Sequence, residues 1–200
     1  MMELHKRISL IILAAGKSTR FGSNKLLFEI SGKKLVERVV ETSLASKASE
    51  VVVVVGFEKE KMLPILEGYQ CKIIFNPEFE NGQSSSVLAG AKSVKNEAGA
   101  IMILPGDMAY VSVEHINKVI DEYNSLPSSI VVASFDNKMG HPILFDRALF
   151  NEILNITEKR FGLKEVVDRH RAEIRRVEVG SAEILLDVDV PEDIKSNKGR

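Results

Sequence analysis

The sequence is poor in cysteine, has no excess of either charge and contains no long apolar run. Its single cysteine, Cys71, excludes an internal disulfide and a cysteine-rich zinc site, and it agrees with a reducing cytoplasm. The 27 basic and 28 acidic residues leave a net charge of -1, whereas domains that chiefly bind nucleic acid usually carry a positive excess. No apolar run approaches the roughly 18 residues of a membrane span. We therefore expect a cytoplasmic protein with neither a nucleic-acid nor a membrane partner.

Internal repeats and flexible linkers are also absent. No stretch rich in Pro, Gly or Ser divides the 200 residues. The apolar content of 44% and the charged content of 28% are close to the averages of globular chains. Together these features predict one domain over residues 1–200, with a less regular second half.

The apolar pattern predicts strands that alternate with helices. The run from Ile8 to Ala15 faintly resembles a secretory signal, but it is short and a glycine-containing loop follows at once, so a buried strand explains it better. Strands are expected at Ile8–Ala14, Glu50–Val55, Lys72–Phe75, Ala100–Leu104 and Ser129–Phe135, with short later ones at His141–Phe145, Arg175–Val179 and Glu183–Leu186. Helices are expected at Lys34–Ser46, Glu58–Glu67, Ser84–Lys95 and Ser112–Tyr123. This order predicts a three-layer, Rossmann-like α/β fold, with an open, mostly parallel sheet and helices on both faces.

The first candidate binding segment is the loop that follows the first strand, from Leu13 to Lys25. Open parallel sheets bind ligands outside the carboxyl ends of their strands. Gly16 and its small neighbours let the backbone approach a ligand, and Arg20 and Lys25 bring two cations suited to phosphate. The same residues could equally form a solvated surface loop. The segment lacks the glycine spacing of both the Walker loop and the dinucleotide fingerprint.

Acidic residues follow two later strands. Asp107 comes after a Pro-Gly turn, where a carboxylate could hold Mg²⁺ together with substrate phosphates. A turn-forming or helix-capping aspartate is the alternative. Asp187 and Asp189 would point to the same side of an extended stretch, or they could belong to a solvated acidic helix start.

A polar loop precedes the helix that is expected from Ser84. Its serines could cap that helix and do nothing else. They could also place hydroxyl and amide groups against a ligand. The residues from Gly82 to Ser86 are therefore a second candidate segment for ligand binding.

Five stretches of the chain recur together in one known family. They are Leu13-Ala14-Ala15-Gly16-Lys17-Ser18-Thr19-Arg20-Phe21-Gly22 with Lys25, Gly82-Gln83-Ser84-Ser85-Ser86-Val87, Leu104-Pro105-Gly106-Asp107, Gly140-His141-Pro142-Ile143-Leu144-Phe145 and Asp187-Val188-Asp189-Val190-Pro191-Glu192-Asp193. They resemble the MocA-like molybdenum cofactor cytidylyltransferases, a branch of the MobA-like nucleotidyltransferase superfamily. The likeness runs in order from residue 8 to about residue 194. It implies a fold of the nucleotide-diphospho-sugar transferase type.

The resemblance implies nucleotidyl transfer. A phosphate of the acceptor would attack the α-phosphorus of a nucleoside triphosphate, and pyrophosphate would leave. Arg20 and Lys25 would neutralise phosphate charge, while Asp107 and Asp189 would hold Mg²⁺. In the family, Ala-Ala before the glycine accompanies the use of cytidine nucleotides, so the resemblance of Ala14-Ala15 points to CTP.

The resemblance also assigns binding residues and partners. His141 would face the acceptor, although a histidine beside proline is as often structural. About residues 1–110 would bind the nucleotide and about residues 111–200 the acceptor, which is molybdopterin or another phosphorylated small molecule. A molybdenum hydroxylase would be the protein partner. The nucleotide contacts would come from Leu13, Ala14, Ala15, Gly16, Lys17, Ser18, Arg20, Lys25, Gly82 and Ser86.

Three departures from the family pattern leave the acceptor open. The chain has Asp107-Met108-Ala109 where relatives carry Asp-Gln-Pro or a similar tripeptide, Val190 in place of threonine, and no Gly-Asp in residues 157–164. The alternatives are a GTP-dependent molybdopterin guanylyltransferase, a cytidylyltransferase for a sugar or alcohol phosphate, and a non-catalytic accessory protein that binds the molybdenum cofactor. The candidate phosphate and metal residues are all intact, which favours an enzyme.

Overall fold

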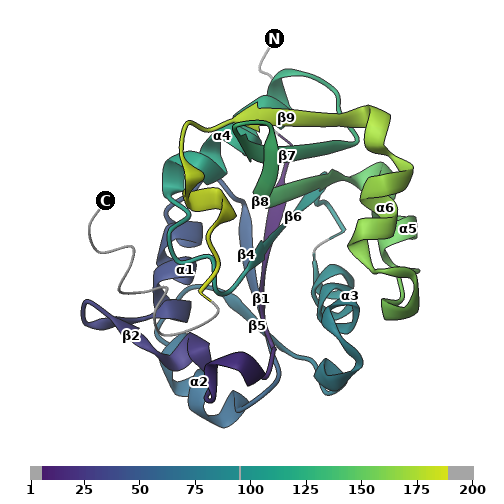
Figure 1. Cartoon of the computed structure of the whole chain (residues 1–200). Helices are drawn as coiled ribbons and strands as arrows, with labels where there is room; N and C mark the ends of the chain where they lie inside the picture. Colours follow the sequence, from purple (N-terminus) through teal and green to yellow (C-terminus); the bar gives the residue numbers. More distant parts are fainter. Residues whose placement is uncertain (1–5, 95, 189–200) are drawn as a thin grey trace.

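A computed structural model describes residues 6–94 and 96–188 of the chain. Within these residues, seven strands form a central sheet in the order β5-β4-β1-β6-β8-β7-β9 (Figure 1). Only β8 runs against its two neighbours, so the sheet is open and mostly parallel, as predicted. The strands are β1 Ile8–Ala14, β4 Glu50–Val55, β5 Lys72–Phe75, β6 Ala100–Pro105, β7 Ile130–Phe135, β8 Lys138–Asp146 and β9 Ile174–Glu178.

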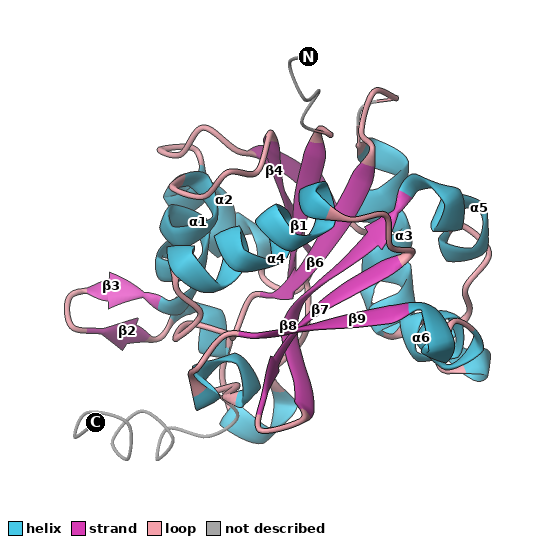
Figure 2. Ribbon diagram, turned by 90° about the horizontal axis from the view of Figure 1, so that it is seen from above, coloured by secondary structure: helices cyan, strands magenta, loops and turns pink. Residues whose placement is uncertain are grey.

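Helices cover both faces of the sheet (Figure 2). One face carries α1 (Leu35–Leu44), α2 (Lys59–Leu66) and α4 (Val113–Ser125). The other face carries α3 (Gln83–Ser93), α5 (Phe150–Ile153) and α6 (Leu163–Arg169). The predicted three-layer α/β architecture is therefore confirmed. In the described parts of the chain, no helix has both the length and the apolar character needed to cross a membrane.

Each face of the sheet buries its own set of side chains, because successive residues of a strand point to opposite sides. In β1, Leu10 and Ile12 pack in the core on the α1 side, whereas Ile11 packs in the core on the α3 side. All three side chains are fully buried, and each contributes roughly 1.5–3 kcal/mol relative to an exposed position. Gly90 brings α3 close to this surface, since a Cβ there would lie 2.5 Å from Ile11 Cγ2.

Two segments differ from the prediction. The strand expected at Glu183–Leu186 is wrong, because Ala182–Leu185 forms a 3-10 helix. The Ser181 side chain accepts a hydrogen bond from the Glu183 backbone N–H at 3.2 Å, which turns the chain into this helix instead of extending it. A hairpin of β2 (Glu29–Ile30) and β3 (Lys33–Lys34) was not predicted.

The direction of three strands places the candidate segments at one edge of the sheet. β1 and β6 are parallel neighbours and end together, at Ala14 and Pro105. β8 is antiparallel to β6, with Ile103 paired to Ile143, so the beginning of β8 lies at the edge where β1 and β6 end. The loop after β1, the turn after β6 and the first residues of β8 therefore meet.

Candidate active site

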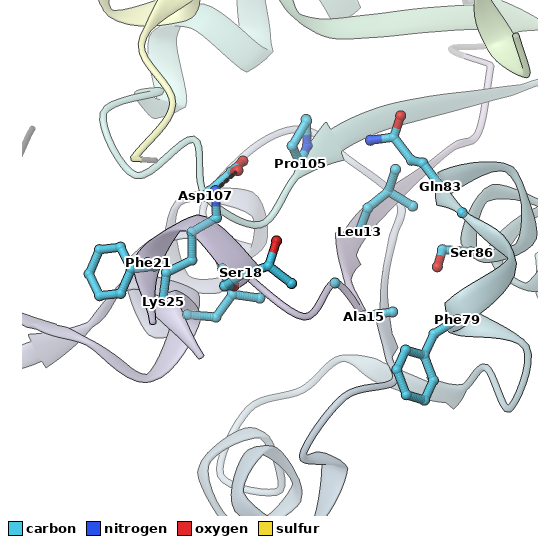
Figure 3. A pocket seen from close by; sticks show the side chains of 14 residues that line it. Leu13, Ala15, Ser18, Phe21, Lys25, Phe79, Gln83, Ser86, Pro105 and Asp107 are labelled. Carbon is cyan, nitrogen blue, oxygen red and sulfur yellow. Dashed lines mark ion pairs between the residues drawn. The ribbon is translucent and has the colours of Figure 1, made fainter. Parts of the chain in front are cut away.

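A hollow of about 330 Å³ lies at this edge, between the loop after β1 and the start of α3 (Figure 3). The loop after β1 and the turn after β6 are tied together, because Gly106 donates its backbone N–H to Leu13 O at 2.9 Å. We call this space the first hollow. It is lined by Leu13, Ala15, Gly16, Ser18, Thr19, Phe21, Lys25, Leu26, Phe79, Gly82, Gln83, Ser86, Pro105 and Asp107.

An ion pair crosses one end of the first hollow, and Figure 3 draws it as a dashed line. Lys25 Nζ lies 2.6 Å from Asp107 Oδ2, and the two side chains are only 13% and 18% exposed. The backbone that carries Lys25 is fixed locally, since the buried Asn24 side chain accepts from the Leu26 backbone N–H at 3.2 Å. A cation and a carboxylate are thus held in place before any ligand binds.

The two oxygens of the Asp107 carboxylate have different surroundings. Oδ1 is buried and has no hydrogen-bond partner among the described residues, although Oδ2 is paired. A buried polar atom in this state is unfavourable unless an ion, a water or a ligand group meets it. Mg²⁺ prefers oxygen ligands and needs only one or two carboxylates beside water and phosphate oxygens. Asp107 therefore fits the predicted metal, while Asp189 lies outside the described residues.

The opposite wall is the start of α3, where Asn76 holds two of the serines. The Asn76 side-chain amide donates to Ser85 Oγ at 2.9 Å and to Ser86 Oγ at 3.1 Å. Asn76 and Ser86 are both buried, at 3% and 5% exposure. In Figure 3, Gln83 and Ser86 lie across the hollow from Lys25 and Asp107.

A second hollow of about 350 Å³ adjoins the first. The two hollows have Gln83, Pro105 and Asp107 in common. The two hollows thus meet at the residue that fits a metal ion. The remaining lining residues of the second hollow are Met108, Met139, Gly140, His141, Ile184, Leu185 and Asp187.

His141 presents a second orphaned polar atom in this region. Its Nδ1 is buried and has no hydrogen-bond partner in the described parts of the chain. Burial lowers the pKa of the imidazole, and this outweighs the opposing influence of the nearby Asp107 carboxylate. The ring is therefore neutral at pH 7, and Nδ1 can donate or accept one hydrogen bond from a ligand.

The structure brings most of the predicted site residues together. Eight of them line the first hollow, and His141 lines the second beside Asp107. Ala14 points into the hydrophobic core, and Lys17 pairs with Glu80 at 2.5 Å on the surface, so neither side chain lines a hollow. Arg20 belongs to the 3-10 helix Thr19–Phe21, and its side chain is outside the described part of the structure.

Several lining residues were not named individually from the sequence. Gln83 borders both hollows, and Phe21 and Phe79 supply aromatic walls to the first. Gln83 lies inside the segment from Gly82 to Ser86, which the sequence predicted as a candidate for ligand binding. The aromatic residues carry no such signal, since isolated phenylalanines are common in ordinary cores.

Residues 10–174 match the family described as the MobA-like NTP transferase domain. The chain belongs to this family. The match includes every residue that lines the first hollow, and the MobA-like superfamily expected from the motifs is thereby confirmed. The MocA-like branch stays a prediction.

Individual relatives agree with the family and the fold. The Bifunctional protein GlmU of Lactobacillus johnsonii is 30% identical over 160 residues, which are 78% of this chain and 34% of that protein. The chain thus spans about a third of the length of the curated relatives that it matches. Among solved structures, Rv0371c from Mycobacterium tuberculosis H37Rv is 21% identical, with a TM-score of 0.84 over 96% of this chain and 97% of that chain.

Two further solved structures share the fold. Rv0371c has also been solved in complex with manganese. Molybdopterin-guanine dinucleotide biosynthesis protein A from Archaeoglobus fulgidus is 17% identical, with a TM-score of 0.66 over 94% of this chain and 95% of that chain. At these identities the solved structures show a shared fold.

Proposed function

We propose that this chain is a Mg²⁺-dependent cytidylyltransferase that transfers CMP from CTP to the phosphate of molybdopterin and releases pyrophosphate. The observation that carries the proposal is the pair of adjoining hollows with Asp107 in their common wall. A reaction that joins two substrates needs both of them held within reach of one charged centre. The first hollow would hold the nucleotide, and the second would hold the acceptor.

The residues of the first hollow suit a reaction that depends on positioning and charge. An ionised acceptor phosphate already carries its nucleophilic oxygen, and the described lining of the first hollow contains neither histidine nor cysteine. Lys25 would neutralise the negative charge that grows on the triphosphate and on the leaving pyrophosphate. Asp107 would hold Mg²⁺ through Oδ1, and the bound ion would supply a Lewis-acid charge to the phosphate oxygens. The pair between Oδ2 and Lys25 keeps both groups oriented beforehand.

The proposed division of the chain into two halves agrees with the lining of the hollows. Every residue that lines the first hollow falls between positions 13 and 107. The residues found only in the second hollow fall between positions 108 and 187. We propose a single domain in which about residues 1–110 bind the nucleotide and about residues 111–200 bind the acceptor.

The choice of CTP and molybdopterin as substrates is supported by sequence motifs. CTP is supported by Ala14-Ala15 in the resemblance, and molybdopterin by the later motifs. The likeness to the Archaeoglobus protein, whose name contains molybdopterin-guanine dinucleotide, favours GTP-dependent guanylyl transfer as a second candidate. The family resemblance also supports a molybdenum hydroxylase as the protein partner, and the single cysteine agrees with the cytoplasm as the location.

Pyrophosphate release tests the proposal directly. The protein would be incubated with Mg²⁺, with each of the nucleoside triphosphates in turn, and with molybdopterin, a sugar phosphate or an alcohol phosphate. We expect release with CTP and molybdopterin. Release with GTP instead of CTP would establish the second candidate, and release with a sugar or alcohol phosphate alone would overturn the acceptor. Tight binding of the cofactor without any release would show a non-catalytic accessory protein.

A further inference from the structure

The carboxylate of Glu158 reaches the start of α3 from a distant part of the chain. Glu158 begins the 3-10 helix Glu158–Arg160, between α5 and α6. Its Oε2 accepts from the Ser84 hydroxyl at 2.6 Å and from the Ser84 backbone N–H at 3.0 Å, although the two residues are 74 positions apart. These hydrogen bonds, that of the Ser84 side chain first, lower the pKa of Glu158. Glu158 is therefore an anion at neutral pH and caps the first turn of α3.

Two glycines let the two segments approach each other this closely. Gly82 has φ 95° and ψ 178°, a backbone conformation that is essentially confined to glycine, and a Cβ there would lie 2.4 Å from Glu158 Cδ. Gly162, with φ 55°, faces the other side of the contact, where a Cβ would lie 2.5 Å from Ser84 Oγ. The turn around Glu158 thus fits tightly against the segment from Gly82 to Ser84.

Glu158 contacts this segment but does not line the first hollow. Ser84, which donates both hydrogen bonds, is 5% exposed and does not line the hollow. Its neighbours Gly82, Gln83 and Ser86 do line it. The contact therefore fixes the position of one wall without entering the binding space.

The charge of Glu158 also gives the two walls of the first hollow different electrostatic character. An anion at the N-terminus of α3 already compensates the positive end of that helix and would repel a triphosphate placed there. Lys25 provides positive charge at the opposite wall. The arrangement therefore favours the phosphates beside Lys25 and leaves the wall from Gly82 to Ser86 for the base.

We propose that Glu158 is a positioning residue for the nucleotide: by holding Ser84 it fixes the wall from Gly82 to Ser86 and so sets both the affinity and the base selectivity of the first hollow. This inference rests on the assignment of the first hollow to the nucleotide. It adds a specificity role for a residue in the late segment 157–164, which lacks the Gly-Asp of the family pattern.

Three variants and one matched control test the role. Glu158→Gln keeps the shape of the side chain but replaces the charge-assisted hydrogen bonds from Ser84 by weaker, neutral hydrogen bonding. Ser84→Ala removes the hydroxyl donor alone, and the double variant combines the two. Glu152→Gln is the control. Glu152 lies in α5, pairs with Arg169 and His170, and makes no hydrogen bond to α3 within the described part of the chain.

Amide hydrogen exchange on the ligand-free protein is the first measurement. We expect faster exchange in residues 82–86 of Glu158→Gln and unchanged exchange there in Glu152→Gln. Calorimetric titration with CTP, GTP, ATP and UTP is the second measurement. We expect Glu158→Gln to weaken binding of the preferred nucleotide about fivefold, or about 1 kcal/mol, and to narrow its preference over the others. The double variant should lose little more than either single variant, since both remove one contact.

The outcomes separate this inference from the proposed function. Unchanged exchange in residues 82–86 overturns the inference, and so does faster exchange with unchanged or tighter nucleotide binding. A loss of affinity that is equal for all four nucleotides overturns the selectivity role. Nucleotide binding that responds as expected, in a protein that releases no pyrophosphate with any acceptor, would refute the proposed reaction and leave the role of Glu158 intact.

Discussion

Replacing Asp107 by asparagine should damage catalysis far more than it damages the fold. The change keeps the size and shape of the side chain and removes its charge. The new side chain would still offer an oxygen to Lys25 Nζ, which lies 2.6 Å from Asp107 Oδ2 in the native protein. It would present a neutral amide where the buried, unpartnered Oδ1 now stands, and a neutral amide is a poor substitute for a metal-binding carboxylate.

The two effects have different sizes. A hydrogen bond between charged partners contributes about 1.5–3 kcal/mol to stability and an ordinary one about 0.5–1.5 kcal/mol, so the free energy of unfolding should fall by about 1–2 kcal/mol. Loss of one electrostatic group that stabilises a transition state costs about 3–4 kcal/mol, or roughly 10²- to 10³-fold in kcat. The half-saturating Mg²⁺ concentration should rise as well.

Urea denaturation without Mg²⁺ gives the stability change, and pyrophosphate release at several Mg²⁺ concentrations gives kcat and the metal dependence. Asp121→Asn is the matched control. Asp121 pairs with Lys47 at 2.7 Å, but both side chains are more than half exposed, at 56% and 57%. That pair should contribute less than about 1 kcal/mol, and its loss should leave kcat unchanged.

The reasoning would be refuted by an Asp107→Asn variant that keeps wild-type kcat and wild-type Mg²⁺ dependence. It would also be refuted if kcat fell only in proportion to the loss of folded protein. In either case the orphaned Oδ1 would have another explanation than a metal.

Three further predictions concern the fold. Gly82→Ala should cost about 1–3 kcal/mol of unfolding free energy in urea, because the backbone there is confined to glycine and a Cβ would meet a carboxyl carbon at 2.4 Å; unchanged stability would contradict this. Hydrogen bonds to Glu173 and a second glutamate raise the pKa of His170, so its stabilisation is complete below the unfolded pKa of about 6.5 and is lost as pH rises through the folded pKa. His170→Gln should remove this part of the pH dependence of unfolding, and an identical pH profile would argue against it. Tyr123→Phe removes a hydroxyl that donates to Asp146 Oδ2 at 2.6 Å, and calorimetry should show a loss of about 1–3 kcal/mol with kcat unchanged, because this contact lies at the far end of the sheet.

The strands of the first half could be predicted because runs of apolar residues indicate strands that are buried on both faces. The strands Ile8–Ala14 and Glu50–Val55 contain the continuous apolar runs 10–14 and 51–55, which are typical of strands covered on both faces, and the structure gives both strands the predicted bounds. The reversal of β8 could not be read from hydrophobicity. It depends on the two-residue turn Asp136-Asn137, in which both residues have positive φ, and it makes β8 begin before the expected His141.

In the candidate site, too, some features could be predicted from the sequence and others could not. Lys25 and Asp107 were predicted from two loops, since parallel strands deliver their carboxyl ends to one edge. Their direct pairing depends on side-chain packing that no spacing encodes. Glu158 was beyond prediction for a stronger reason: it meets Ser84 only because α5 and α6 pack beside α3, and nothing local marks a glutamate as the cap of a distant helix.

Gln83, Pro105 and Asp107 border both hollows, so a product that joins nucleotide to acceptor would occupy the two spaces at once. Each half of such a product would keep the other half at a high local concentration, as in a bivalent ligand. The product would then have a longer residence time than either substrate, and its departure would limit the rate of turnover. A protein that takes the product directly from this site would therefore raise the rate of turnover without changing the rate of the chemical step.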